Sequence, residues 1–251
     1  HYNHWIADRT IDFLSRHAGS AGNRLTTGNP FFLFCSFPDP HFPYAATKPY
    51  SEMYKPEDVD LPATYRNRKE LIPFLERYRP FFGRNDAPEE DQIREIIAQT
   101  YGMITHVDDN IGRILDHLAA LGLTENTHII LTADHGEYLG NHDLIHKGAY
   151  PYECLWRIPF IWKAPGGSDQ DCDRPTATVD FVPTICELTG LDVDFFMARG
   201  FGDSNKLAMP GQSLVPALNG EALTNRPVLL EYDEDCHAGP LFRQRGLVDG
   251  A

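Results

Sequence analysis

Two stretches near the middle of the chain carry side chains that suit metal and anion chemistry. The apolar run 128–132 is followed closely by Asp134 and His135, and a carboxylate beside an imidazole can bind a divalent cation. Lys147 lies in a second loop, rich in His and Gly. An ammonium group near a cation favours binding of an anion. This combination predicts chemistry on a phosphate or sulfate ester; the alternative for Lys147 is an ordinary solvated lysine.

His41 is a third candidate, in the proline-rich segment 37–44. The flanking prolines restrict the backbone and hold the loop rigid. A rigid imidazole after a strand could donate to an ester oxygen or protonate a leaving group. The alternative is a loop histidine that caps a neighbouring carbonyl group.

Several other polar residues were weighed against plainer interpretations. His142 and His146 lie in the same loop as Lys147, residues 142–148, which is called the lysine loop below. They could support it as hydrogen-bond donors. Asp108 and Asp109 form an acidic pair, but they fall inside a predicted helix, where a solvated face is favoured. The run 233–235 is a surface charge cluster by the same argument, although it follows a predicted strand and could approach the site.

Hydrophobic periodicity gives the elements that must position these residues. It predicts helices at 6–17, 88–121 and 179–189, and strands at 31–37, 128–132, 158–162 and 228–231. Alternating helices and strands predict an α/β fold with a mostly parallel central sheet flanked by helices. The unbroken apolar runs favour strands buried on both faces. Asp134, His41 and Lys147 then follow predicted strands, at the sheet edge where ligands bind.

The connecting segments have different compositions. Residues 19–28 read as a glycine-rich loop, 38–88 as a long excursion with short helices, and 192–212 as a surface connection. The five cysteines are odd in number and lack C-x-x-C spacing, which favours buried free thiols over a disulfide framework or a zinc ribbon.

Length and charge limit the class of protein. A chain of 251 residues can bury a substantial core. Its net charge of −14 argues against binding nucleic acid or an anionic membrane. No apolar run approaches the roughly 18 residues that span a bilayer. The sequence opens without a Met or a signal peptide, which is typical of a segment of a longer protein.

Six segments together resemble the sulfatase family of the alkaline-phosphatase-like superfamily, in order and in spacing. They are FPDPHFPY (37–44), YGMITHVDDNIG (101–112), TADHGE (132–137), HKG (146–148), RIPFI (157–161) and PGQSLVP (210–216). The resemblance implies an alkaline-phosphatase-like α/β fold that is incomplete at its N-terminal side. Residues 1–190 would form the C-terminal part of the catalytic domain, and 191–251 a connection and the start of a C-terminal subdomain.

The resemblance also implies roles for the candidate residues. Asp134 and His135 would be metal ligands, while His41 and Lys147 would contact the ester oxygens and take part in catalysis. His135 in place of an asparagine resembles the branch containing iduronate-type sulfatases and phosphonate monoester hydrolases. Calcium is the first candidate metal on family grounds, with Mn²⁺ or Zn²⁺ as alternatives because imidazole suits them better.

The family's nucleophile is a formylglycine made from a Cys/Ser-x-Pro-x-Arg motif, which these residues lack. The formylglycine and the family's paired metal aspartates are therefore expected upstream of this chain. The implied activity is metal-dependent hydrolysis of sulfate esters, so the expected partner is an anionic sulfate or phosphate ester of a small molecule or sugar, with no nucleic acid and no membrane.

Three alternatives stay open. The first is a phosphonate monoester or phosphodiester hydrolase of the same superfamily, because both substrates present similar tetrahedral oxyanions. The second is a two-metal phosphomutase or phosphodiesterase, which needs a further downstream ligand for which only His237 is available. The third is a catalytically inert fragment or binding remnant.

Overall fold

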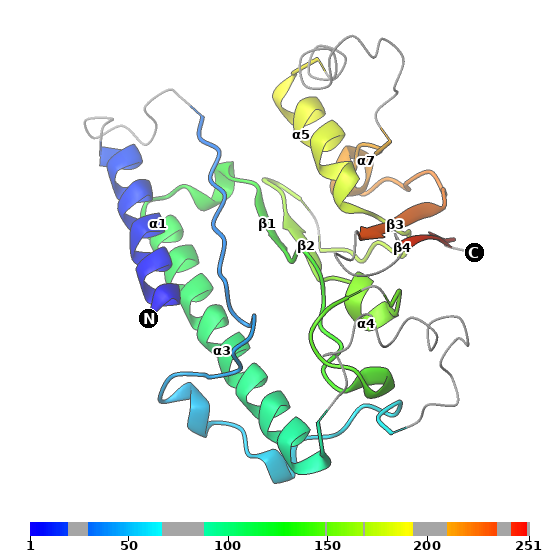
Figure 1. The fold of residues 1–251 in the computed structure, drawn as a ribbon. Helices are drawn as coiled ribbons and strands as arrows, with labels where there is room; N and C mark the ends of the chain where they lie inside the picture. Colours follow the sequence, from blue (N-terminus) through cyan, green and yellow to red (C-terminus); the bar gives the residue numbers. More distant parts are fainter. Residues whose placement is uncertain are drawn as a thin grey trace. The chain divides into compact units, whose positions relative to one another are not determined.

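The computed structural model describes residues 1–19, 30–66, 88–148, 150–167, 169–192, 210–234 and 242–249. They belong to two compact units, residues 1–160 and 161–251 (Figure 1). Among the described helices, none combines the length and the apolar content that crossing a bilayer requires. Most of the predicted connections 19–28 and 192–212, and the second half of 38–88, lie outside the described residues.

The first unit is built on two long helices, α1 (Tyr2–Gly19) and α3 (Glu90–Ala120), which run side by side (Figure 1). Leu14 of α1 and Leu118 of α3 share a buried apolar cluster. Nearer the start of α1, Asp8 pairs with Arg113 of α3 at 2.6 Å. Contacts that advance together along both helices mean that the two are parallel. These helices confirm the predicted helices at 6–17 and 88–121.

The ends of α3 follow from its sequence. Glu90 and Asp91 occupy the first turn, where carboxylates interact favourably with the helix dipole. Gly122 follows the helix at φ +68°, and its N–H donates to the Ala119 carbonyl at 2.9 Å. A glycine adopts this left-handed conformation without strain and so ends the helix.

A second apolar cluster joins the N-terminal half of α3 to two loops. Ile93, Ile97 and Ala98 of α3 bury their side chains against Val59 and Ile145. Val59 follows two short 3₁₀ helices, η1 (Tyr50–Glu52) and η2 (Pro56–Asp58). Ile145 lies two residues before the candidate lysine, so this cluster anchors the lysine loop to α3.

The predicted strand at 31–37 is wrong. Residues 30–38 are extended, but no strand is assigned there among the described residues. Burial alternates along the segment: Phe31 and Leu33 pack against the cluster between α1 and α3, whereas Phe32 and Phe34 are 76% and 81% exposed. The apolar run is therefore buried on one face only, because no described strand or layer packs against the other face.

β1 (Ile129–Thr132) matches the predicted strand at 128–132, after the 3₁₀ helix η5 (Thr124–Asn126). Its expected burial is wrong, since Ile130 and Leu131 are each more than one third exposed. The short elements η6 (Asn141–Asp143) and α4 (Glu153–Trp156) follow in the first unit.

The second unit contains β2 (Phe160–Lys163), η7 (Thr178–Asp180), α5 (Phe181–Thr189), α7 (Val215–Leu218), β3 (Val228–Glu234) and β4 (Phe242–Val248). β2, α5 and β3 match the predicted elements at 158–162, 179–189 and 228–231. β3 and β4 form an antiparallel ladder with Leu230 opposite Gly246. β4 was not predicted from the sequence.

A buried carboxylate organises the second unit. Asp180, at the start of α5, is completely buried. It accepts hydrogen bonds from the N–H groups of Ala177 and Gln212, at 2.9 and 2.8 Å, and pairs with the guanidinium of Arg226. One carboxylate thus ties η7, the segment after residue 209 and the approach to β3 together.

The described cysteines are free, as predicted. Cys35 and Cys154 are half-buried, Cys186 is buried, and Cys172 is exposed, contrary to the expected burial. Cys236 lies outside the described residues.

Candidate active site

Asp134 and His135 converge just after β1, although adjacent side chains on an extended strand would point apart. The His135 N–H donates to Asp134 Oδ1 at 2.9 Å. On the same side, His135 Nε2 lies 3.5 Å from Asp134 Oδ2. The chain therefore turns here as the sequence required, and a carboxylate and an imidazole nitrogen face the same small region.

The hydrogen bonding of His135 fixes which nitrogen is available. Nδ1 lies 2.7 Å from the Gly136 carbonyl oxygen, which can only accept, so Nδ1 carries the proton. The lone pair is then on Nε2, the nitrogen nearest Asp134. Such a carbonyl contact is the usual way in which a metal-binding histidine is oriented.

Lys147 reaches the same place. Its Nζ lies 2.9 Å from His135 Nε2, and the contact is exposed to solvent. The ammonium donates, and the imidazole lone pair accepts. The structure therefore brings together three of the four residues that the sequence singled out, from segments separated by 12 residues.

The lysine loop is held by backbone hydrogen bonds and by buried side chains. The N–H of Tyr138 donates to the His146 carbonyl at 3.0 Å, and that of Gly140 to the Leu144 carbonyl at 2.8 Å. Tyr138 and Leu144 are almost completely buried. These contacts hold together the two ends of the segment between Asp134 and Lys147 and so fix the position of the Lys147 backbone.

Gly136 is needed for packing and not for backbone freedom. Its φ is not in the left-handed region. Its N–H donates to the Leu155 carbonyl at 2.6 Å, and an added Cβ would lie 2.0 Å from the Cys154 carbonyl oxygen. Close approach of two backbones therefore requires glycine here.

His41 lies next to the lysine loop through an aromatic chain of contacts. Its ring stacks on Phe42 at 4.4 Å, and the Phe42 ring lies 4.7 Å from His146. His41 Nδ1 is 2.8 Å from the Phe42 carbonyl oxygen, as in the carbonyl-capping alternative, so Nδ1 is the protonated nitrogen and Nε2 carries the lone pair. Burial lowers the pKa of His146.

Two residues next to the lysine loop, Tyr44 and Glu137, were not among the predicted site residues. The Tyr44 hydroxyl lies 3.0 Å from His146 Nδ1 and also hydrogen-bonds Glu137. Burial raises the pKa of Glu137, and burial and that carboxylate raise the pKa of Tyr44. Their signal was present, because Tyr44 ends the FPDPHFPY segment and Glu137 ends TADHGE.

The remaining candidates lie elsewhere. The His142 ring stacks on Tyr152 at 3.6 Å. Asp108 and Asp109 are exposed on α3, as the solvated-face interpretation predicted. The side chains of 233–235 and His237 lie outside the described residues.

Asp134 and His135 fit part of a coordination shell for a divalent cation. One carboxylate and one oriented imidazole are suitable donors, whereas Zn²⁺ takes about four ligands and Ca²⁺ about six to eight. Within the described ranges, no third His, Cys, Asp or Glu atom groups with these two. These two residues alone would therefore be only part of a complete set of metal ligands.

Comparisons with known proteins agree with this geometry. Residues 4–191 match the family described as Sulfatase. The chain is 34% identical over 224 residues to the multifunctional alkaline phosphatase superfamily protein PehA of Trinickia caryophylli, covering 83% of this chain and 41% of that protein. It is 28% identical over 248 residues to the choline-sulfatase of Rhizobium meliloti, covering 96% and 44%.

The solved structures agree in fold. The phosphonate monoester hydrolase of Agrobacterium radiobacter superposes with a TM-score of 0.73 at 26% identity, over 92% of this chain and 45% of that one. The chain thus spans less than half the length of these relatives. Since the family match covers most of the chain, including His41, Asp134, His135 and Lys147, the chain belongs to the sulfatase family and has its alkaline-phosphatase-like α/β fold.

Proposed function

We propose that this protein is a metal-dependent hydrolase of sulfate esters, and that the chain supplies the metal ligands Asp134 and His135 and the substrate contacts His41 and Lys147. The observation that carries the proposal is the 2.9 Å contact between Lys147 Nζ and His135 Nε2, 3.5 Å from the Asp134 carboxylate. Two cation ligands and an ammonium group at one point match the needs of a tetrahedral oxyanion.

Lys147 binds the anion. In the absence of substrate its ammonium donates a hydrogen bond to His135 Nε2. The single lone pair of this nitrogen can interact with the ammonium or with a metal ion, but not with both. Asp134 and His135 Nε2 would hold the metal, and the Lys147 ammonium would then contact a non-bridging ester oxygen. There it stabilises the charge that grows in the transition state, a contribution worth roughly 10²- to 10³-fold in rate for a single donor.

His41 serves the leaving group. Its Nδ1 is engaged with the Phe42 carbonyl, which leaves Nε2 to take up a proton from solvent and donate it to the departing oxygen. The divalent metal, with calcium first on family grounds and Mn²⁺ or Zn²⁺ next, polarises the ester oxygens when bound. The family's formylglycine motif does not occur in these residues, so activity is a property to be measured on the full-length protein.

Relatives indicate the substrate class and a second candidate function. They include an arylsulfatase of Clostridium perfringens, 30% identical, and the human N-acetylglucosamine-6-sulfatase, 26% identical. We therefore favour an anionic sulfate ester of a small molecule or sugar. Hydrolysis of phosphonate monoesters or phosphodiesters is the second candidate, favoured by His135 and by the likeness to solved phosphonate monoester hydrolases.

Parallel assays on the full-length protein test the proposal. An aryl sulfate should be hydrolysed with the higher kcat/KM, and an aryl phosphodiester turned over orders of magnitude faster would contradict the sulfatase assignment. Lys147→Ala should lower kcat/KM by about 10²- to 10³-fold. The matched control is Lys48→Ala, which removes an ammonium paired with Glu52 at the surface and should leave kcat/KM within about twofold.

A further inference from the structure

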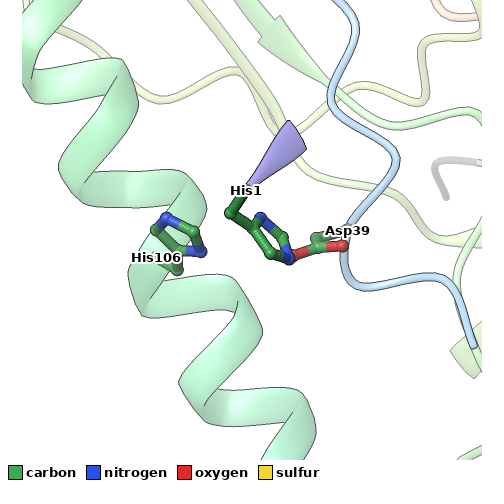
Figure 2. A group of neighbouring side chains, drawn as sticks. All are labelled: His1, Asp39 and His106. Atoms are coloured by element: carbon green, nitrogen blue, oxygen red, sulfur yellow. The ribbon is translucent and has the colours of Figure 1, made fainter. Parts of the chain in front are cut away.

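A second group of metal-competent side chains lies at the start of α1. His1, Asp39 and His106 come from the beginning of the chain, from the loop that carries His41, and from the middle of α3 (Figure 2). One ligand atom from each lies within 4.8 Å of the others. In the described part of the chain, this is the one group of three or more such residues.

The hydrogen bonds of Asn3 show which nitrogen of His106 has the lone pair. Its side chain is completely buried, and its Nδ2 donates to Asp39 Oδ2 at 2.8 Å and lies 3.3 Å from His106 Nδ1. An amide N–H can only donate, so His106 Nδ1 is the acceptor with the lone pair. His106 Nε2 then carries the proton and donates to His4 Nδ1 at 2.8 Å.

The same residue leaves one buried polar atom without a partner. Asn3 Oδ1 is inaccessible and has no hydrogen-bond partner among the described residues. A buried carbonyl oxygen without a donor costs about 1–3 kcal/mol. A water molecule held by a cation between Asp39 and His106 would supply the missing donor.

We propose that His1, Asp39 and His106 bind a divalent transition-metal ion, with Zn²⁺ the best match, at a site other than Asp134–His135. Two imidazoles and one carboxylate form a ligand set suited to Zn²⁺ and unsuited to Ca²⁺, which prefers oxygen. Three protein ligands leave a fourth position for water, the expected partner of Asn3 Oδ1.

The geometry needs only a small adjustment. A tetrahedral ion with bonds of about 2.0–2.2 Å holds its ligands roughly 3.4 Å apart, so the ligand atoms, now within 4.8 Å of one another, must approach by up to about 1.4 Å. His1 Nε2 already lies 3.9 Å from Asp39 Oδ2. His1 is exposed, whereas His106 is buried and stacked on Tyr50 at 4.4 Å. The mobile ligand is therefore the one that faces solvent, which also gives the ion a path in.

Binding there would fasten three segments at one point. Asp39 lies two residues before His41, so the ion would fix the base of the loop that carries the proposed leaving-group histidine. The site is thus structural, and its occupancy is measurable without any enzymatic assay.

Metal binding by variants of the full-length protein tests the inference. The double variant Asp134→Ala/His135→Ala removes the candidate active-site ligands, and after chelation it should still take up one Co²⁺ per chain with the visible absorption of tetrahedral cobalt. Adding Asp39→Asn or His106→Gln should weaken this binding at least 100-fold. Adding His17→Gln, at a histidine of α1 that packs against Phe13 and Phe31, should leave it unchanged.

Two results would overturn the inference. One is a double variant that binds no Co²⁺ with a tetrahedral spectrum. The other is an Asp39→Asn addition that retains full affinity, since the three side chains would then be only a hydrogen-bonded contact. Asp39→Asn has nearly the shape of the wild-type residue, and an unchanged circular dichroism spectrum would show that weakened binding does not come from unfolding.

Discussion

The Tyr44 hydroxyl links two groups behind the lysine loop, His146 and Glu137. Tyr44→Phe keeps the ring and removes that link, leaving Glu137 buried with one partner fewer. We expect a loss of about 1–3 kcal/mol in the free energy of unfolding, and a fall in kcat through the displaced lysine. Denaturant titration and steady-state kinetics measure the two effects.

A matched control is Tyr54→Phe, whose hydroxyl meets Thr105 at 2.8 Å on the surface. It should change stability by less than about 0.5 kcal/mol. Equal effects of the two substitutions would mean that Tyr44 has no special role behind Lys147.

The sequence could predict those residues of the candidate site whose side-chain type alone indicates metal or anion binding. Asp134, His135 and Lys147 stand out because carboxylate, imidazole and ammonium groups follow an apolar run at short spacing. Tyr44 and Glu137 do not, because tyrosine and glutamate are common on surfaces. Only folding buries them and brings them to His146.

Two glycines of α3 separate helix propensity from packing. An added Cβ at Gly112 meets nothing within 4 Å, whereas one at Gly102 would lie 2.5 Å from the Tyr50 carbonyl oxygen. Gly112→Ala should therefore stabilise the protein by about 0.5–1 kcal/mol. Gly102→Ala should destabilise it by about 1–3 kcal/mol, because η1 must move away from the helix.

Thermal or chemical unfolding of the two glycine variants measures this difference. Since both positions have the same intrinsic helix propensity, the contrast between the variants reports the contact with Tyr50. Stabilisation by both substitutions would refute the close packing of η1 on α3.

In the second unit, Asp180 should be the most sensitive acidic residue. Asp180→Asn keeps the shape but removes the charge that pairs with Arg226 and accepts two backbone N–H groups. A loss of about 3 kcal/mol is expected for breaking a buried ion pair from one side. Asp173→Asn, at a side chain 96% exposed, is the control and should be neutral. Faster proteolysis after residue 209 in the Asp180 variant alone would support this role.

At the scale of elements, the long helices were predictable and the extended segments less so. α3 was predictable from its apolar residues at helical spacing, its acidic first turn and the following Gly122. The run 31–37 looked like a buried strand because large apolar side chains occur on both of its faces. Whether a strand forms depends on a neighbouring strand, and that neighbour is not encoded in the run itself.

The stability of the whole protein should depend on pH through buried ionisable groups. Burial lowers the pKa of His106 and His146 below the ordinary 6.5, so the unfolded chain binds more protons than the native one near and below that pH. Their contribution therefore falls as pH decreases through 6.5. Burial raises the pKa of Glu137 above its ordinary 4.5, so its contribution falls as pH increases instead.

Unfolding midpoints between pH 7.5 and 5.5, measured with a chelator present, test these signs. His106→Gln should reduce the loss of stability on acidification, and Glu137→Gln should increase it. Parallel curves for the wild-type protein and both variants would show that neither group titrates differently in the folded state.

Residue types and local periodicity were enough to predict the candidate site residues and the positions of the helices, because both are properties of neighbours along the chain. Tertiary structure alone decided that His1, Asp39 and His106 meet, that Gly136 must lack a side chain, and that only one face of 31–37 is covered. Each of these outcomes depends on contact between segments far apart in the chain. No short window of sequence contains both partners of such a contact.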